Sequence, residues 1–192
     1  MQLDQSRPVY INYRAGVRED QVNELMHLIT ALHSHGFEEA HLMISSPGGS
    51  VIRGLEVHNF LRSIPIKITT YNTGSVDSIA NIIYLAGERR YVNRNANFLM
   101  HGVTWHFPHG AGEQQLEEAL AAVRRDQRSI AETISNRTKL AREEIETMFR
   151  GDTILTPDDA LKMGISHQIQ DAVVPEDAQL FVITNSRNGG DD

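Results

Sequence analysis

The sequence lacks the residues on which several classes of protein depend. It has no cysteine, so disulfide bonds and thiolate chemistry are excluded. Aromatic residues make up only 6% of the chain, and no window approaches the roughly 18 apolar residues of a membrane span. No basic segment followed by an apolar one is found at the N-terminus, as a secretory signal would require. We therefore expect a soluble, cytoplasmic protein with no membrane partner.

Positive charge is also sparse. The 18 Lys and Arg residues are outnumbered by 25 Asp and Glu residues, and no run of basic residues exceeds a pair. Proteins that grip nucleic acid backbones usually carry a basic stripe, so nucleic acid is not an expected partner. With 192 residues and 40% hydrophobic content, the composition predicts one compact domain over 1–192. A short lead at 1–7 and a flexible tail at 186–192 are expected at its ends.

The first half of the chain alternates between two hydrophobic periods. This pattern predicts, in order, a strand at 8–13, a helix at 19–35, a strand at 40–46, a helix at 50–63, a strand at 66–71, a helix beginning near Ser78, and short strands at 90–92 and 97–101. Such alternation is typical of an α/β fold with right-handed crossovers around a mainly parallel sheet.

The second half contains one unusually long helical pattern. From about Glu113 to Arg137, apolar residues recur at helical spacing, interrupted by Gln127. At about 1.5 Å per residue this helix would be some 35 Å long, about as long as the domain is wide. We expect it to project and to pack on a second copy of the chain. A shorter helix is expected at 142–149, and another is capped by Thr156 and ended by Gly164.

Two strand-to-helix turns are candidates for a site. They are SSPGGSV at 45–51 and NTGSVDSI at 72–79. In an open α/β sheet such turns gather at the carboxyl edge, where ligands bind. Paired glycines allow backbone N–H groups to point into a shared cavity, as an oxyanion requires. A tight turn without function is the alternative, and no phosphate-loop motif is present.

Ser78 is the strongest candidate nucleophile on local grounds. It lies one residue before a wholly helical run at 79–86, whose N-terminus favours developing negative charge. No serine lies in the GxSxG motif of α/β-hydrolases. Ser75 could instead be the reactive residue, and either serine could be only a helix cap.

A nucleophilic serine needs a base and a group that orients that base. His101 ends the strand NFLMH, so its ring is expected at the edge where both turns open. Asp152 lies in a Gly-Asp-Thr turn with no clear capping duty, although a turn role is its alternative. A metal site formed by His101, His106 and His109 has no known ligand spacing, so neither a metal nor another cofactor is expected.

Together these residues resemble the Clp protease proteolytic subunits, the ClpP family, within the ClpP/crotonase fold group. The resemblance covers roughly Val9 to Ile169. The motifs that carry it are SPGGSV at 46–51, Gly74 to Ser78 with the helix that ends in Ala86 and Gly87, the strand NFLMH, the long helix, and GDTILTPDDALKMG at 151–164. It implies an α/β fold of repeated ββα units in a superhelix, with the long helix as a protruding handle.

The resemblance also implies an activity and a set of roles. Ser78 would be the nucleophile, His101 the general base and Asp152 the carboxylate that holds the imidazole, with the backbone N–H groups of Gly49 and Ile79 as oxyanion hole. The expected function is serine-type endopeptidase activity on unfolded proteins or peptides, inside a chamber built by a homo-oligomer of rings or stacked rings. An AAA+ unfoldase is a conceivable partner, but the segment before Val9 is too short for the axial hairpin that such subunits carry.

Two alternatives remain open at this point. Asp77 and Asn81 flank Ser78 where the family usually has small or apolar residues. This departure would suit a catalytically inactive structural or regulatory subunit of the same fold. Crotonase-type acyl-CoA chemistry is the other alternative, although it does not need the ordered Ser, His and Asp.

Overall fold

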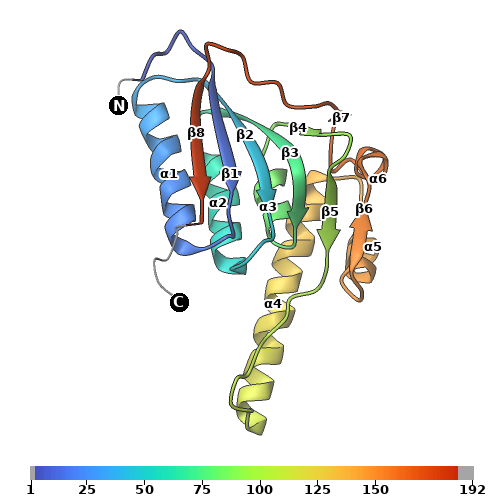
Figure 1. Cartoon of the computed structure of the whole chain (residues 1–192). Coiled ribbons are helices and arrows are strands. Elements are labelled where there is room, and N and C mark those ends of the chain that lie inside the picture. The colour runs from blue at the N-terminus through green and yellow to red at the C-terminus, as the bar shows by residue number, and fades with distance from the viewer. Residues whose placement is uncertain (1–2, 186–192) are drawn as a thin grey trace, which may run out of the picture.

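A computed structural model describes residues 3–185, so the expected tail at 186–192 lies outside the described residues. Strands and helices alternate along the chain (Figure 1). In order they are β1 (Val9–Arg14), α1 (Glu19–Ser34), β2 (Glu39–Ser46), α2 (Val51–Ser63), β3 (Lys67–Asp77), α3 (Ala80–Leu85), β4 (Arg89–Val92), β5 (Asn97–Met100), α4 (Glu113–Arg137), α5 (Arg142–Met148), β6 (Thr153–Leu155), α6 (Pro157–Lys162), β7 (Gln168–Ile169) and β8 (Gln179–Thr184).

All the strands belong to one sheet. Its main path runs β6-β5-β3-β2-β1-β8, while β4 pairs with β3 and β7. Every pairing is parallel except that of β5 with β6. The first part of β3 pairs with β4 and its last three residues pair with β5. The expected mainly parallel α/β sheet is confirmed.

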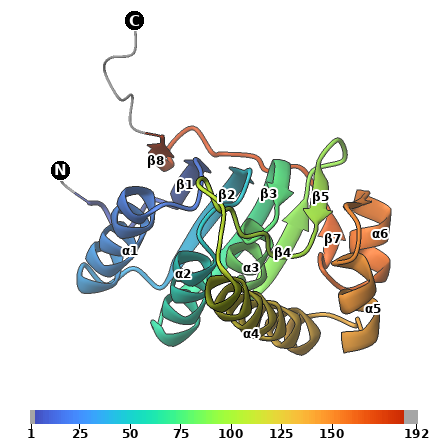
Figure 2. The same cartoon turned by 90° about the horizontal axis from the view of Figure 1, so that it is seen from below.

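The helices cover one face of this sheet, and the main core lies between the two layers. Figure 2 shows α1, α2, α3 and α4 on the same side of the strands. Side chains such as Ile11, Leu42, Ile68, Val76 and Phe98 point from the strands into this layer and are essentially inaccessible to solvent. Burying apolar area of this kind is the main term that stabilises the fold.

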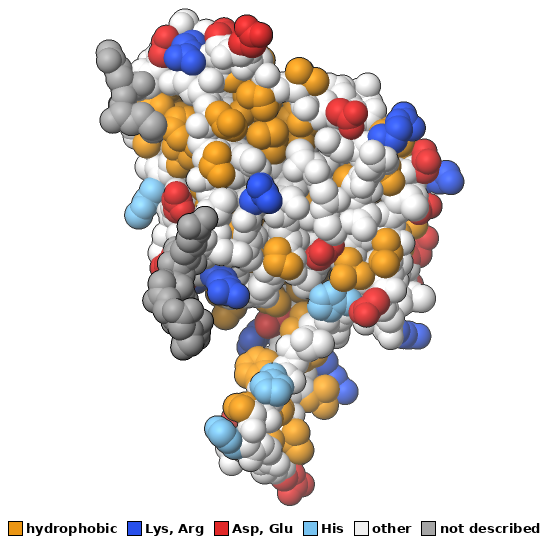
Figure 3. All heavy atoms as spheres, in the orientation of Figure 1, with side chains coloured by type: hydrophobic (Ala, Val, Ile, Leu, Met, Phe, Trp, Pro, Cys, Tyr) orange, Lys and Arg blue, Asp and Glu red, His pale blue; other side chains and the backbone are white. Residues whose placement is uncertain are grey.

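The other face of the sheet carries an aromatic cluster. Tyr10, Met43 and Tyr71 are buried there beneath the segment that connects β7 to β8. The ring of His41 stacks on Tyr10 with centroids 4.4 Å apart. Beside this cluster, Leu180 and Val182 of β8 are about half exposed, and Figure 3 shows hydrophobic side chains gathered on the upper part of this face.

One buried arginine joins the ends of three helices. The guanidinium of Arg90 donates to the carbonyl oxygens of Gly87, after α3, of Arg137, at the end of α4, and of Ile165 and Gly164, after α6. Burial lowers the pKa of Arg90 to about 10. Arg90 thus supplies donors to carbonyl groups near helix ends, where the helical hydrogen-bond pattern stops, and Arg137 adds a second donor to the Gly87 carbonyl.

The long helix matches its expected bounds. Helix α4 spans 25 residues, and its N-terminal half projects beyond the sheet (Figure 1). The chain that follows β5 runs alongside it to the tip before the helix turns back. Within residues 3–185, no helix is both long and apolar enough to cross a membrane.

Three strands and one strand extension differ from the sequence-based expectation. Strand β3 continues to Asp77 through NTGSVD, which reads as a turn, because Val76 pairs with Phe98 of β5 and is fully buried. The pairing of β2 with β3 shifts register within this stretch. Strands β6, β7 and β8 were not predicted, since each is stabilised by a partner distant in sequence.

Helix α2 fixes the position of α3 through a buried histidine. The Nδ1 of His58 lies 2.8 Å from the carbonyl oxygen of Ile82 and donates to it in the neutral ring. Burial lowers the pKa of His58, and the nearby charges of Arg137 and Arg62 lower it further, against the hydrogen bond to Ile82. The unfolded chain, with a histidine pKa near 6.5, therefore binds this proton more readily than the folded chain.

We expect the free energy of unfolding to be greatest above about pH 6.5 and to fall as the pH drops below that value. His58→Asn, which can keep the donor to Ile82, should lessen this fall in the free energy of unfolding. Part of the fall should remain, because burial also lowers the pKa values of His41 and His167. Urea unfolding at pH 7 and pH 5 measures the effect, with exposed His27→Gln as control. An equal fall in wild type and His58→Asn would contradict the assignment.

Candidate active site

The ends of three parallel strands meet at one edge of the sheet. Strands β2, β3 and β5 run in the same direction, so the turn after Ser46, the junction at Ser78 and the segment from His101 emerge together. A pocket of about 90 Å³, open to solvent, lies at this edge. Its lining comprises Gly49, Val51, Ser78, Ile79, Asn81, Met100, His101, Gly102, Val103, Thr104, Ile130, Ile134 and Phe149.

The backbone of Ser78 is strained. Its φ of 55° is the only positive φ at a residue other than glycine within the described part of the chain. This left-handed region costs a side-chain-bearing residue about 1–2 kcal/mol. The Ser78 N–H donates to the Leu99 carbonyl at 2.8 Å, and the Ser78 carbonyl accepts from the Asn81 N–H at 3.1 Å. Strain of this kind persists only where the surroundings enforce it, which is common at functional sites.

The glycine turn after β2 packs directly against Ser78. A Cβ on Gly48 would lie 2.7 Å from the Cβ of Ser78 and 2.8 Å from the Asp77 carbonyl oxygen. Gly48 and Gly49 have φ values of 84° and 150°, which other residues rarely adopt. The Gly48 carbonyl accepts from the Val17 N–H at 2.8 Å, which ties the turn to the segment after β1. Both glycines are therefore required by a close approach.

Two backbone donors border the pocket without partners. Among residues 3–185, neither the N–H of Gly49 nor that of Ile79 forms a hydrogen bond. Ile79 is the N-cap residue of α3, and the isolated parallel bridge of Gly49 with Val17 uses the Gly48 carbonyl and the Ser50 N–H, so neither pattern uses these two donors. Two such donors beside a serine are what an oxyanion hole needs.

His101 lies in the same pocket, half-buried. Its Nδ1 is 2.8 Å from the carbonyl oxygen of Gly102, so the neutral ring donates there and Nε2 is left as an acceptor. The Ser78 hydroxyl forms no hydrogen bond with any residue between 3 and 185. The pocket thus holds the expected nucleophile and the expected base, with no hydrogen bond joining them in this single chain.

Asp152 lies outside the pocket, in the exposed turn between α5 and β6. The antiparallel register of β5 and β6 pairs Leu99 with Ile154 and Met100 with Thr153. Continued by one residue, the same register places His101 opposite Asp152. Directly opposed residues have Cβ atoms about 4.5–5.5 Å apart, so side-chain rotation could bring the carboxylate to the imidazole. In the present conformation the Gly102 carbonyl occupies the Nδ1 position instead.

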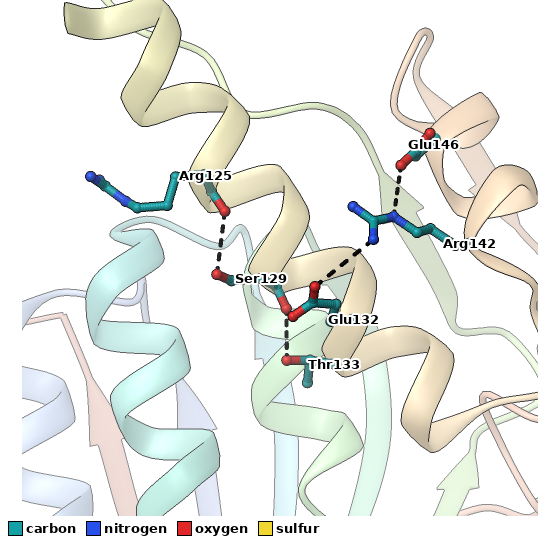
Figure 4. A network of polar contacts seen from close by, with 6 residues as sticks. All are labelled: Arg125, Ser129, Glu132, Thr133, Arg142 and Glu146. Atoms are coloured by element: carbon teal, nitrogen blue, oxygen red, sulfur yellow. Dashed lines mark hydrogen bonds and ion pairs between the residues drawn. The ribbon is translucent and has the colours of Figure 1, made fainter.

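The helix before Asp152 is fastened to α4 by charged groups. Figure 4 shows Arg142 of α5 between Glu132 of α4 and Glu146 of α5. The nitrogen-to-oxygen distances are 3.9 and 2.9 Å respectively. Both pairs are solvent-accessible and worth about 0–1 kcal/mol each. Of these two pairs, the one with Glu132 links α5 to α4, and the one with Glu146 lies within α5.

Asp77 and Ser75 lie on the opposite face of the sheet from the pocket. Their neighbour Val76 points into the core, and side chains alternate along a strand. Asp77 pairs with Leu99 and Ser75 donates its hydroxyl proton to the Asp77 carboxylate. Ser75, the alternative nucleophile, and Asp77, the departure that would suit an inactive subunit, are both absent from the pocket lining.

The alternative metal site is not assembled either. His106 and His109 lie exposed in the segment before α4, away from the pocket lining. Across residues 3–185, no group of three or more His, Cys, Asp or Glu side chains is placed to hold a metal ion.

Several pocket residues were not identified from the sequence. Gly102 allows a close approach, because a Cβ there would lie 2.7 Å from both the Gln127 side-chain nitrogen and the Phe149 carbonyl oxygen. Gln127, which interrupts the apolar stripe of α4, therefore packs beside the segment that carries His101. Asn81 was noted only as a departure from the family near Ser78, and its place in the pocket lining was not predicted.

Comparison with known proteins decides the family. A sequence model of the family described as Clp protease matches residues 2–173. The chain belongs to the Clp protease family. The ATP-dependent Clp protease proteolytic subunit 1 of Leifsonia xyli is 24% identical over 161 residues, which cover 82% of this chain and 81% of that protein. The corresponding subunit of Deinococcus radiodurans is 23% identical over 158 residues, covering 81% and 76%.

A solved structure of another protein has the same fold as this chain. A point mutant of ClpP1 from Listeria monocytogenes superposes with a TM-score of 0.74 at 23% identity, covering 85% of this chain and 91% of that one. The predicted family, the ClpP-type α/β fold and the serine endopeptidase class are confirmed. The roles of individual residues stay predictions.

The strain at Ser78 makes a prediction about stability. Ser78→Gly should be more stable than Ser78→Ala by about 1 kcal/mol, because glycine adopts positive φ without a Cβ clash. Urea unfolding of the two variants measures the difference. At Ser129, within α4, the same pair of substitutions should give the reverse order, since glycine is disfavoured in a helix. A Ser78→Ala variant as stable as Ser78→Gly would show that the site is unstrained.

Proposed function

We propose that this chain hydrolyses peptide bonds with a Ser78, His101 and Asp152 triad, and that it works as a homo-oligomer. The backbone N–H groups of Gly49 and Ile79 form the oxyanion hole in this proposal. The observation that carries it is the strained Ser78, which shares one pocket with His101 and with two unpartnered backbone donors.

In the proposed reaction the pocket supplies a base, a nucleophile and charge stabilisation. Nε2 of His101 removes the Ser78 hydroxyl proton as Oγ attacks the carbonyl carbon of the substrate. The resulting oxyanion accepts hydrogen bonds from Gly49 and Ile79. His101 then gives the proton to the leaving amine, and the Ser78 acyl ester remains. Water, deprotonated by His101, releases the acid and returns Ser78 to its starting state.

Asp152 completes this arrangement by replacing the Gly102 carbonyl at Nδ1. A carbonyl fixes the tautomer of a neutral imidazole, whereas a carboxylate also stabilises the imidazolium that forms during attack. The β5 and β6 register supports this role, because continuing it by one residue beyond the pair of Met100 and Thr153 sets His101 opposite Asp152. The exposed position of the turn leaves the carboxylate room to rotate.

The lining of the pocket supports a preference for apolar substrate side chains. Beside Ser78 it is formed by Val51, Met100, Ile130, Ile134 and Phe149. A polar side chain would lose hydration there without gaining a partner, whereas an apolar one would bury its surface. We therefore expect cleavage after apolar residues.

The projecting half of α4 supports the proposed oligomer. Leu116 and Leu120 are about half exposed on it, as is Trp105 in the segment alongside, and Figure 3 shows hydrophobic side chains along this projection. One stripe of α4 reads Glu113, Glu117, Leu120, Arg124 and Arg128, at steps of four, three, four and four.

That stripe is complementary to itself. When two copies of α4 lie antiparallel about a twofold axis next to Leu120, Glu117 faces Arg124 of the second copy and Glu113 faces Arg128 of that copy. Opposite charges then alternate around a shared apolar centre, which suits an isologous contact. The proposed assembly joins two chains through these helices.

Labelling by a fluorophosphonate probe tests the catalytic proposal. The wild-type chain should label at Ser78, Ser78→Ala should not label, and His101→Ala should label at least about 100-fold more slowly, as expected on loss of a general base. Asp152→Asn, which keeps the shape of the side chain, should also label more slowly. Mass spectrometry of the labelled peptide identifies the site.

Ser75→Ala is the matched control, since Ser75 lies on the other face of the sheet. It should label like wild type. Labelling that survives in Ser78→Ala would overturn the nucleophile assignment. A correctly assembled wild-type chain that does not label would favour the inactive structural or regulatory subunit, and acyl-CoA binding would favour crotonase-type chemistry.

Charge reversal on α4 tests the assembly. The double variant Glu113→Lys with Glu117→Lys should dissociate into smaller species, because lysine would face arginine across the contact. Adding Arg124→Glu and Arg128→Glu should restore the wild-type mass, since the stripe is again self-complementary. Native mass spectrometry and sedimentation at low salt, where such pairs are least screened, give the measurement. An unchanged mass in the double variant would place the contact elsewhere.

A further inference from the structure

Asn81 is a buried polar side chain at the start of α3. Only 2% of its surface is exposed. The helix around it, from Ala80 to Leu85, is otherwise buried and largely apolar. Asparagine is a poor helix former, and burying its amide is costly unless the amide is hydrogen-bonded. Its presence here therefore needs an explanation beyond packing.

The amide of Asn81 donates two hydrogen bonds across the active-site junction. Its Nδ2 lies 2.9 Å from the carbonyl oxygen of Ser78 and 2.9 Å from that of Leu99. The Leu99 carbonyl also accepts the N–H of Ser78. One side-chain amide thus ties the main chain of the expected nucleophile to strand β5, two residues before His101.

The bonds act on the residue that is strained. Ser78 keeps a φ of 55° only while neighbouring groups enforce it. Gly48 packs on one side of Ser78, and the Asn81 amide holds its carbonyl on the other. Because the same amide holds Leu99, a change in the position of Ser78 must also move β5 and the segment that leads to His101.

We propose that Asn81 is a positioning residue that fixes the Ser78 hydroxyl relative to His101 through its two Nδ2 hydrogen bonds. This inference rests on the proposed function of Ser78 and His101. The Oδ1 of Asn81 is buried and has no partner among residues 3–185, although Asn81 lines the pocket. We call the two Nδ2 hydrogen bonds, to the Ser78 and Leu99 carbonyls, the Asn81 clamp. The competing explanation is that Oδ1 acts as acceptor from a group in the pocket, and the experiment separates the two.

The test compares three substitutions at this position in the full-length chain. Asn81→Ala removes both the donor and the acceptor. Asn81→Asp keeps an oxygen in place of Oδ1 but replaces the donor with a second acceptor facing two carbonyl oxygens. Asn81→Ser is small and can still donate to the Ser78 carbonyl three residues earlier, as helical serines do. The probe is a fluorophosphonate, with the maximal labelling rate and the half-saturating probe concentration measured separately.

The clamp predicts a specific order. The maximal labelling rate should fall about 10- to 100-fold in Asn81→Ala, because two hydrogen bonds are lost, with at most about a threefold change in half-saturating concentration. Asn81→Asp should be slower than Asn81→Ala, and Asn81→Ser should recover part of the rate. The midpoint of the pH–rate profile should stay where it is in wild type, because the clamp does not touch the imidazole.

Two outcomes would overturn the proposed role of Asn81. A wild-type labelling rate in Asn81→Ala shows that the amide positions nothing. A rate in Asn81→Asp above that of Asn81→Ala shows that Oδ1, and not Nδ2, carries the effect. Failure of the proposed function is distinguishable, since it appears as Ser78-independent labelling or as no labelling of wild type.

A stability control separates positioning from general loosening. Ile29→Val, on the buried face of α1 and outside the pocket lining, lowers stability by removing one buried methyl group. Its labelling rate should equal that of wild type. Native mass and urea unfolding are recorded for every variant, and if Asn81→Asp does not fold, the ordering of wild type, Asn81→Ser and Asn81→Ala still decides. An equal loss of labelling rate in Ile29→Val would show that the Asn81 variants label more slowly only because they are less stable.

Discussion

The left-handed backbone of Ser78 is the constraint on which the active edge depends. A serine adopts this conformation at a cost, so the neighbouring strands must hold it. Strand β5 supplies the Leu99 carbonyl on one side, and the turn after β2 supplies Gly48 on the other. The position of the expected nucleophile is therefore set by the pairing of β3 with β2 and β5. A local turn alone would relax to a lower-energy conformation.

The sheet separates two neighbouring residues that the sequence places together. Asp77 precedes Ser78, yet it lies on the opposite face, where the Ser75 hydroxyl donates to its carboxylate. Asn81, three residues after Ser78, points back to the junction and contacts both Ser78 and Leu99. Of the two unusual neighbours of Ser78, the acidic one lies apart from the pocket and the neutral amide lines it. The presence of Asp77 is thus compatible with an active serine.

The accuracy of sequence-based prediction followed the range of the interactions involved. Helices α1, α2 and α4 were predicted to within one or two residues, since their apolar stripes are local patterns. The last part of β3 was missed because NTGSVD has the composition of a turn, and only its pairing with β5 makes it a strand. Strand β8 was missed because its partner β1 lies at the other end of the chain, where Val9 pairs with Gln179.

The sequence by itself determined the α/β class, the long helix, the resemblance to Clp proteases and the residue types at the candidate site. Only the tertiary structure decided how those residues meet. It brought Gly49, Ser78 and His101 to one pocket, paired Met100, next to His101, with Thr153, next to Asp152, and gave Asn81 its two carbonyl partners. The physical reason is that these relations depend on strand register and on close glycine contacts between distant segments. Hydrophobic periodicity records which face of an element is buried, but it does not record which residue lies opposite which.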